Sequence, residues 1–192
     1  GPEQEAIRIA RAVSPTSWRG GIHGLTAFDE VLAPKPTAEV LKEFDADAAL
    51  LVGPDWSFLP ITGAGGVDEL VQRFTERRKS PYVFSQGPPG LAAMIVARST
   101  VNAMAERRSR FATIGHLLGY RSERPQADQI VGELCVPTHP QVRSAIGRFA
   151  IDSPRQLMRI GRAIEPLVRD HRAVEPDALE LAIRMEHRIM AG

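Results

Sequence analysis

The feature that most constrains the fold of this chain is a series of short apolar runs that alternate with segments of helical periodicity. The run over residues 48–53 is apolar and stops at Pro54, which is typical of a strand buried on both faces. A second such run covers residues 91–97, and shorter ones cover residues 82–84 and 149–151. Strands that alternate with helices predict an α/β fold with three layers and a mainly parallel sheet.

The helical segments lie around these runs. Apolar residues at helical spacing and capping residues predict helices over residues 4–13, 37–44, 67–78, 99–107, 113–119, 154–164 and 176–190, and a further strand is expected over residues 130–136. We expect an α/β domain over residues 1–165, and a helical tail or the start of a further element over residues 166–192. The last helix is apolar on more than one face. It therefore packs on the body of the domain or meets a partner, such as a second copy or another domain.

Composition excludes several classes of protein. No run of about 18 apolar residues is present, and no basic start precedes an apolar run, so neither a membrane span nor a signal peptide is expected. The formal net charge of +1 disfavours a nucleic-acid binder. Cys135 is the single cysteine, which excludes an intramolecular disulfide and a thiolate zinc cluster. These features favour a cytoplasmic protein.

Two aspartates stand at the expected carboxyl ends of strands. Asp55 and Asp152 each follow an apolar run, and ligands of open α/β sheets bind beyond these ends. Two such carboxylates could share Mg²⁺, which binds one or two carboxylates together with water and phosphates. Alternatively, Asp152 caps the helix that begins at Pro154, and Asp55 caps a turn.

Three other residues are candidates for substrate binding. Gln86 lies in a Gly- and Pro-rich connection and could read a hydroxyl or a base edge, and Gly90 would let the backbone approach a ligand closely. The alternative is an ordinary tight connection. Arg19 precedes two glycines and could hold a phosphate or a carboxylate, or be solvated. Neither a phosphate-loop motif nor a His-Glu-x-x-His zinc motif occurs.

Four segments carry a family resemblance in their joint order. They are residues 18–21 with residues 28–32, residues 47–60, residues 89–97 and residues 148–157. Together they resemble the cytidylyltransferase-like branch of the nucleotide-diphospho-sugar transferases, which includes CMP-sugar synthetases and spore-coat polysaccharide cytidylyltransferases. The resemblance covers about residues 4–165. It implies transfer of a nucleotidyl group from CTP to a sugar, with Mg²⁺ on Asp55 and Asp152 and with Arg19, Gln86 and Gly90 on the sugar side.

The chain also departs from this family. The family begins with a strand and a glycine-rich loop that cradles the triphosphate, and nothing similar precedes residue 4. Pro54 and Trp56 flank the aspartate of the middle loop. We therefore expect a truncated chain, a degenerate domain or half of a split enzyme. The alternative is a non-catalytic domain that binds a nucleotide or nucleotide sugar, or docks a partner through the helices after residue 165. A third interpretation is an α/β ligand-binding domain unrelated to nucleotides.

Overall fold

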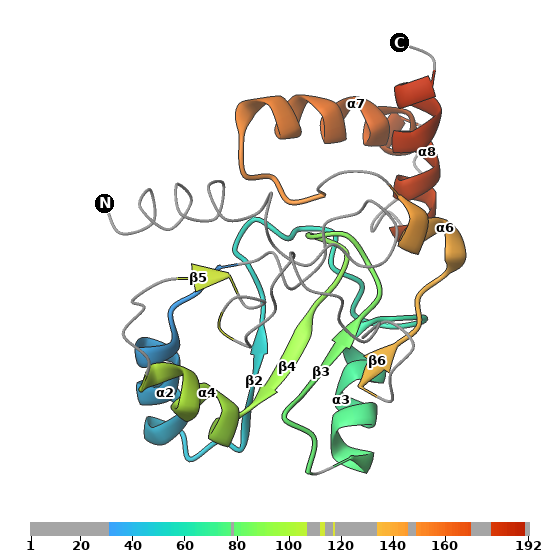
Figure 1. The fold of residues 1–192 in the computed structure, drawn as a ribbon. Coiled ribbons are helices and arrows are strands. Elements are labelled where there is room, and N and C mark those ends of the chain that lie inside the picture. Colours follow the sequence, from blue (N-terminus) through green and yellow to red (C-terminus); the bar gives the residue numbers. More distant parts are fainter. Residues whose placement is uncertain are drawn as a thin grey trace, which may run out of the picture.

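The computed structural model describes residues 31–77, 79–106, 112–113, 117, 134–145, 149–169 and 178–190. These residues mix helices and strands, as the sequence predicts (Figure 1). The strands are β1 (Val31–Leu32), β2 (Ala48–Leu51), β3 (Tyr82–Ser85), β4 (Met94–Ala97), β5 (Ala112–Thr113) and β6 (Cys135–Val136). The helices are α2 (Pro34–Glu43), α3 (Val67–Glu76), α4 (Arg98–Ala105), α6 (Pro140–Ser144), α7 (Pro154–Arg169) and α8 (Ala178–Met190).

The central sheet has the order β2-β4-β3-β6, and one of its strands runs against the other three. β4 pairs antiparallel with both β2 and β3, whereas β3 pairs parallel with β6. The prediction of a mainly parallel sheet is therefore not confirmed for the described strands. The reason is that residues 86–93 alone connect β3 to β4, and a parallel crossover needs a dozen or more residues.

β2 lies at one edge of this sheet. Leu50 is 39% exposed, and the other residues of β2 are half-buried. The expectation that residues 48–53 form a strand buried on both faces is thus wrong, because β2 pairs on one side with β4 and has no described strand on the other. β3 is buried at every position, and β4 is buried up to Val96, as expected for residues 82–84 and 91–97.

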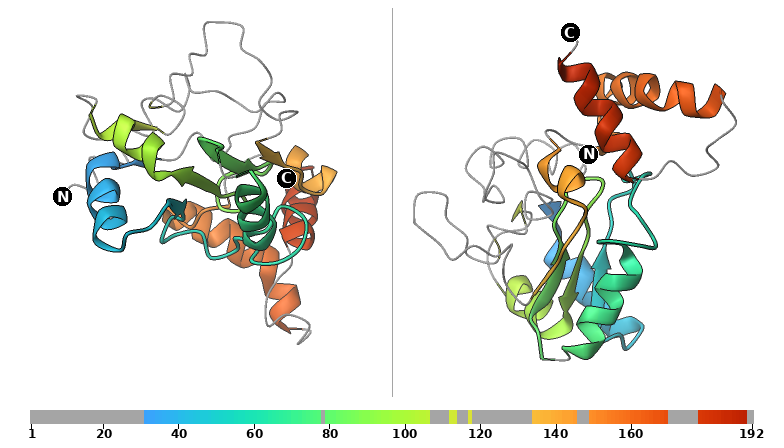
Figure 2. Two further views of the ribbon diagram at one scale, coloured as in Figure 1. Left: turned by 90° about the horizontal axis from the view of Figure 1, so that it is seen from below. Right: turned by 90° about the vertical axis from the view of Figure 1, so that its right-hand side faces the viewer.

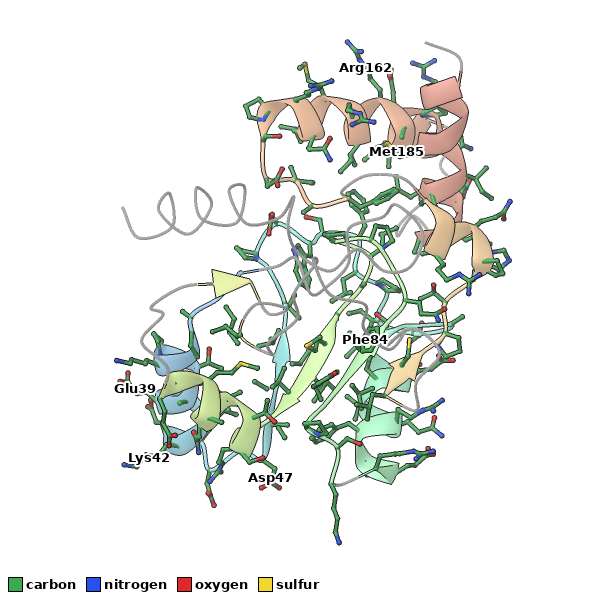
Figure 3. The ribbon with its side chains drawn as sticks, viewed as in Figure 1. Glu39, Lys42, Asp47, Phe84, Arg162 and Met185 are labelled. Carbon is green, nitrogen blue, oxygen red and sulfur yellow. The ribbon has the colours of Figure 1, made fainter. Side chains whose placement is uncertain are left out.

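Helices cover both faces of the sheet. Successive apolar side chains of β3 and β4 point to opposite faces, and each face packs against helices. One set packs with α2 and α4, and it consists of Tyr82, Phe84, Met94 and Val96. The opposite set, Val83 and Ile95, shares a cluster with Leu70 of α3. Figure 2 shows α4 and α3 on opposite sides of the sheet. In Figure 3, Phe84 lies in the interior, whereas Glu39 and Lys42 lie on the outer side of α2.

α7 and α8 pack against the loops at one end of the sheet. Their apolar residues form a third cluster with Leu91 of the β3–β4 connection and with Phe149. Met185 of α8 is buried in this cluster, whereas Arg162 of α7 points away from the rest of the chain (Figure 3). α7 continues past residue 165, where the sequence predicts the α/β domain to end.

The remaining predictions have mixed outcomes. The helices expected over residues 37–44, 67–78, 99–107, 154–164 and 176–190 correspond to α2, α3, α4, α7 and α8, and β6 lies within residues 130–136. Residues 149–151 are irregular and pair with no described strand. The expected helix over residues 4–13 and most of the one over residues 113–119 lie outside the described residues. No described helix has the length and apolar character needed to cross a lipid bilayer.

The Ser85 side chain joins the two ends of the β3–β4 connection by a buried hydrogen bond. It is fully buried, and its Oγ accepts a hydrogen bond from the backbone N–H of Ala93 at 3.0 Å. Ser85→Ala leaves this N–H without its acceptor, which we expect to lower the free energy of unfolding by about 1–3 kcal/mol. Urea denaturation measures the loss. The control is Ser99→Ala on the exposed side of α4, expected within about 0.5 kcal/mol of wild type. Equal stability of the two variants would contradict this role of Ser85.

Candidate functional site

The loops that carry the predicted site residues meet at one end of the sheet. β2, β3 and β6 run in the same direction, so their carboxyl ends lie together, at the upper end of the sheet in Figure 1. Asp55 lies in the loop after β2, and Gln86 and Gly90 lie in the β3–β4 connection. Asp152 lies two residues before the start of α7. These residues therefore lie at one end of the sheet, although the sheet differs from the predicted one and Asp152 does not follow a strand as expected.

Residues 149–152, here called the crossing segment, tie the two loops together. The backbone N–H of Phe149 donates to the carbonyl oxygen of Pro89 at 2.8 Å, and that of Ile151 donates to the carbonyl oxygen of Asp55 at 2.8 Å. The second bond sets Asp152 one residue away from a direct backbone contact with Asp55. The structure thus brings together the segments that carry the two aspartates, which are far apart in the sequence.

Gly90 makes this crossing possible. Its φ of 93° lies in the left-handed region that favours glycine. A β-carbon at this position would stand 2.4 Å from the carbonyl carbon of Phe149 and 2.5 Å from the nitrogen of Ala150. The sequence predicts that Gly90 admits a ligand close to the backbone. In the structure, the backbone of the crossing segment occupies the space beside its α-carbon.

Gly53 gives the Asp55 loop its shape. The loop turns at residues 53–56, where the backbone N–H of Trp56 donates to the carbonyl oxygen of Gly53 at 3.2 Å. The backbone therefore closes this turn. A β-carbon at position 53 would stand 2.6 Å from Oδ1 of Asp55 and 2.5 Å from Nε1 of Trp56. Glycine thus leaves room for a carboxylate and an indole edge beside the same backbone position.

Trp56 buries a polar atom in this loop. The residue is 6% exposed and packs with Leu70, Val83 and Ala150 on the α3 side of the sheet. In the described part of the chain, no group accepts a hydrogen bond from its Nε1–H. Leaving such a buried donor unpaired costs about 1–3 kcal/mol. The Asp55 loop therefore contains one buried hydrogen-bond donor without an acceptor.

Ser153, rather than Asp152, caps α7. The Oγ of Ser153 accepts a hydrogen bond from the backbone N–H of Gln156 at 3.3 Å, and its carbonyl oxygen accepts from that of Leu157 at 2.9 Å. A serine followed three residues later by glutamine is the sequence pattern of a capping box. The alternative of Asp152 as the helix cap is therefore not what the structure shows. Asp152 is half-buried and stands just before the positive end of the helix dipole.

The other two predicted site residues differ in what the structure shows of them. Gln86 is half-buried at the same end of the sheet. Its backbone is fixed by two hydrogen bonds, because its N–H donates to the carbonyl oxygen of Val136 at 3.1 Å and its carbonyl oxygen accepts from the hydroxyl of Thr138 at 2.6 Å. Arg19 lies outside the described residues.

The donor chemistry fits one kind of cation. Among the described residues, no three His, Cys, Asp or Glu side chains gather in a way that could hold a metal ion. Structural zinc sites need four protein ligands and catalytic ones need three, so the described residues do not fit zinc. Mg²⁺ keeps several waters and binds proteins through one or two carboxylates plus phosphate oxygens. Asp55 and Asp152 supply two carboxylates on segments joined by a backbone hydrogen bond, a number of carboxylates that Mg²⁺ could use, and a buried N–H lies in the Asp55 loop.

Comparison of the chain with protein-family models, with curated proteins and with solved structures gives no match.

Two features of the site escape the sequence analysis. From the sequence, Trp56 is only a departure from the family loop. No sequence pattern shows that its indole nitrogen is buried without an acceptor. The contact of Gly90 with the crossing segment is equally invisible, since it joins residues far apart in the chain. A signal for the Ser153 cap is present in the Ser-x-x-Gln spacing.

Gly90→Ala tests whether the crossing segment holds the site together. The new β-carbon would meet backbone atoms at 2.4–2.8 Å and would sit at a strained φ. We expect the free energy of unfolding to fall by about 2–4 kcal/mol, measured by urea denaturation.

The matched control is Gly161→Ala in α7, where a β-carbon would meet nothing within 4 Å. Alanine at a helix position stabilises by about 0.5–1 kcal/mol relative to glycine. If Gly90→Ala is as stable as Gly161→Ala, the close contact at Gly90 does not hold the crossing segment.

Proposed function

We propose that this chain is a domain of the sugar-nucleotidyltransferase type, which transfers a nucleotidyl group from CTP to a sugar with Mg²⁺. One observation carries the proposal: the backbone hydrogen bond from Ile151 to Asp55 places Asp152 beside the Asp55 loop. The ordered resemblance of four segments supports the same activity. The proposal includes a nucleotide-diphospho-sugar transferase-like fold, a nucleotide or nucleotide sugar as ligand, a role in polysaccharide biosynthesis and a cytoplasmic location.

Asp55 and Asp152 would hold the ion. When bound, Mg²⁺ neutralises charge on the phosphates while a sugar oxygen attacks the α-phosphate and pyrophosphate leaves. The chain itself holds the two segments that carry these aspartates against each other. The turn at Gly53 fixes the backbone of Asp55, and the Ser153 cap fixes the residue that follows Asp152.

The sugar side of the proposal rests on the β3–β4 connection. The two backbone hydrogen bonds of Gln86 hold it at the carboxyl end of β3, where its amide would select a sugar hydroxyl. The proposal keeps Gly90 on this side, where it positions the crossing segment. It also keeps Arg19, which would bind a phosphate or a sugar carboxylate.

A non-catalytic interaction domain is the second candidate. Leu157, Met158 and Val168 of α7 are 56%, 57% and 59% exposed, and a partner would cover them in this function. This function predicts that no nucleotide stabilises the chain, with or without Mg²⁺.

Ligand-dependent unfolding separates the two functions. We expect CTP with Mg²⁺ to raise the free energy of unfolding by about 2.7 kcal/mol at a hundred times its dissociation constant. CTP without Mg²⁺, and UTP or GTP with it, should stabilise less. No stabilisation by any nucleotide at millimolar concentration would reject the transferase proposal in favour of the interaction domain.

Three variants locate the effect. Asp55→Asn and Asp152→Asn should each abolish most of the stabilisation by CTP and Mg²⁺, since each removes a negative ligand. Asp47→Asn is the control. Asp47 is an exposed aspartate just before β2, at the opposite end of this strand from the Asp55 loop. Its response to CTP and Mg²⁺ should match wild type. A wild-type response in both site variants would show that the two aspartates do not hold the ion.

A further inference from the structure

The proposed function leaves one polar group of the site unused, the indole N–H of Trp56. The residue is 6% exposed, and its Nε1–H has no acceptor in the described part of the chain. A polar group, the Asp55 carboxylate, lies in the same turn as this nitrogen. The nitrogen stands 2.5 Å from the β-carbon position at Gly53, and Oδ1 of Asp55 stands 2.6 Å from the same position.

We propose that Trp56 is a positioning residue whose indole N–H donates to one oxygen of the Asp55 carboxylate and so orients the other oxygen toward a divalent cation. This inference rests on the proposed function, because it assumes that Asp55 is a ligand of that cation. It assigns a role to a residue that lies outside the ligand set itself.

Two observations favour the Asp55 carboxylate as the acceptor over an oxygen of a bound substrate. The indole nitrogen is shielded from solvent, so a ligand atom would have to displace the loop to reach it. The Asp55 carboxylate belongs to the same turn, and its Oδ1 and the indole Nε1 stand 2.6 Å and 2.5 Å from one β-carbon position at Gly53. Carboxylates that bind metals are themselves held by hydrogen bonds from a surrounding layer of residues.

The glycine at position 53 is part of the same device. Any side chain there would start between the carboxylate and the indole nitrogen, and it would separate donor from acceptor. Gly53, Asp55 and Trp56 therefore act together: the glycine provides the space, the aspartate provides the ligand and the tryptophan fixes its orientation.

The first test follows the indole N–H of the full chain by nuclear magnetic resonance. The chain has two tryptophans, and Trp56→Phe assigns the signal of Trp56 by deleting it. We expect saturating Mg²⁺ to move this signal downfield in wild type, because the N–H gains a charged acceptor. The shift should persist in Asp152→Asn at saturating Mg²⁺ and should vanish in Asp55→Ala.

The second test measures the dissociation constant of Mg²⁺ by calorimetry. Trp56 is replaced by 3-benzothienylalanine, which keeps the bicyclic shape and has sulfur in place of the N–H. We expect Mg²⁺ to bind 10–100-fold more weakly than to wild type, the usual loss when a partner of a metal ligand is removed. Trp56→Phe should weaken binding at least as much. Without Mg²⁺, the benzothienyl variant should be at least as stable to unfolding as wild type, because it removes a buried donor that has no partner.

The outcomes distinguish this inference from the proposed function. If Mg²⁺ binds wild type and the benzothienyl variant equally, or if it binds without moving the Trp56 signal, the positioning role is overturned and the two-aspartate site stands. If Mg²⁺ binds neither protein at millimolar concentration, both the site and the positioning role are overturned. A downfield shift that survives in Asp55→Ala would show that another group accepts the hydrogen bond.

Discussion

The crossing segment is held by two backbone hydrogen bonds, and the arrangement of the candidate site depends on them. One bond ties Phe149 to the β3–β4 connection, and the other ties Ile151 to the loop after β2. Backbone bonds of this kind do not depend on which side chains the segment carries. They involve only the backbone of Asp55 and Ile151, while Gly90 provides the close approach that the crossing needs.

Apolar packing also holds the crossing segment and the Asp55 loop in place. Trp56 from the Asp55 loop and Ala150 from the crossing segment both belong to the apolar cluster on the α3 side of the sheet, together with Leu70. On the other side of the crossing segment, Phe149 joins the cluster of α7 and α8. The two aspartates therefore stand at a junction of two cores, so that a cavity in either core would disturb the position of a carboxylate.

Much of this could be predicted from the sequence, because apolar periodicity and caps are local signals. The helices α2, α3, α4, α7 and α8, the strand at residues 82–84 and the position of Asp55 after a strand follow from such signals. Asp152 follows no strand, because residues 149–151 are irregular. Strand direction did not follow from alternation of elements, although the short connection after Ser85 already excludes a parallel crossover. The edge position of β2 and the unpaired nitrogen of Trp56 depend on partners distant in the chain, and no local pattern reveals them.

The crossing segment also determines when, during folding, the contacts of the candidate site can form. The antiparallel pairings of β2, β3 and β4 arise within residues 48–97, and the β3–β4 pairing closes a short loop, residues 86–93. The hydrogen bond from Ile151 to Asp55 closes a far longer one, and contacts of large sequence separation form at a higher entropic cost. During synthesis, most of the sheet can pair while residues 149–152 are still inside the ribosome. The contact between the crossing segment and the Asp55 loop then forms last, when residues 149–152 arrive.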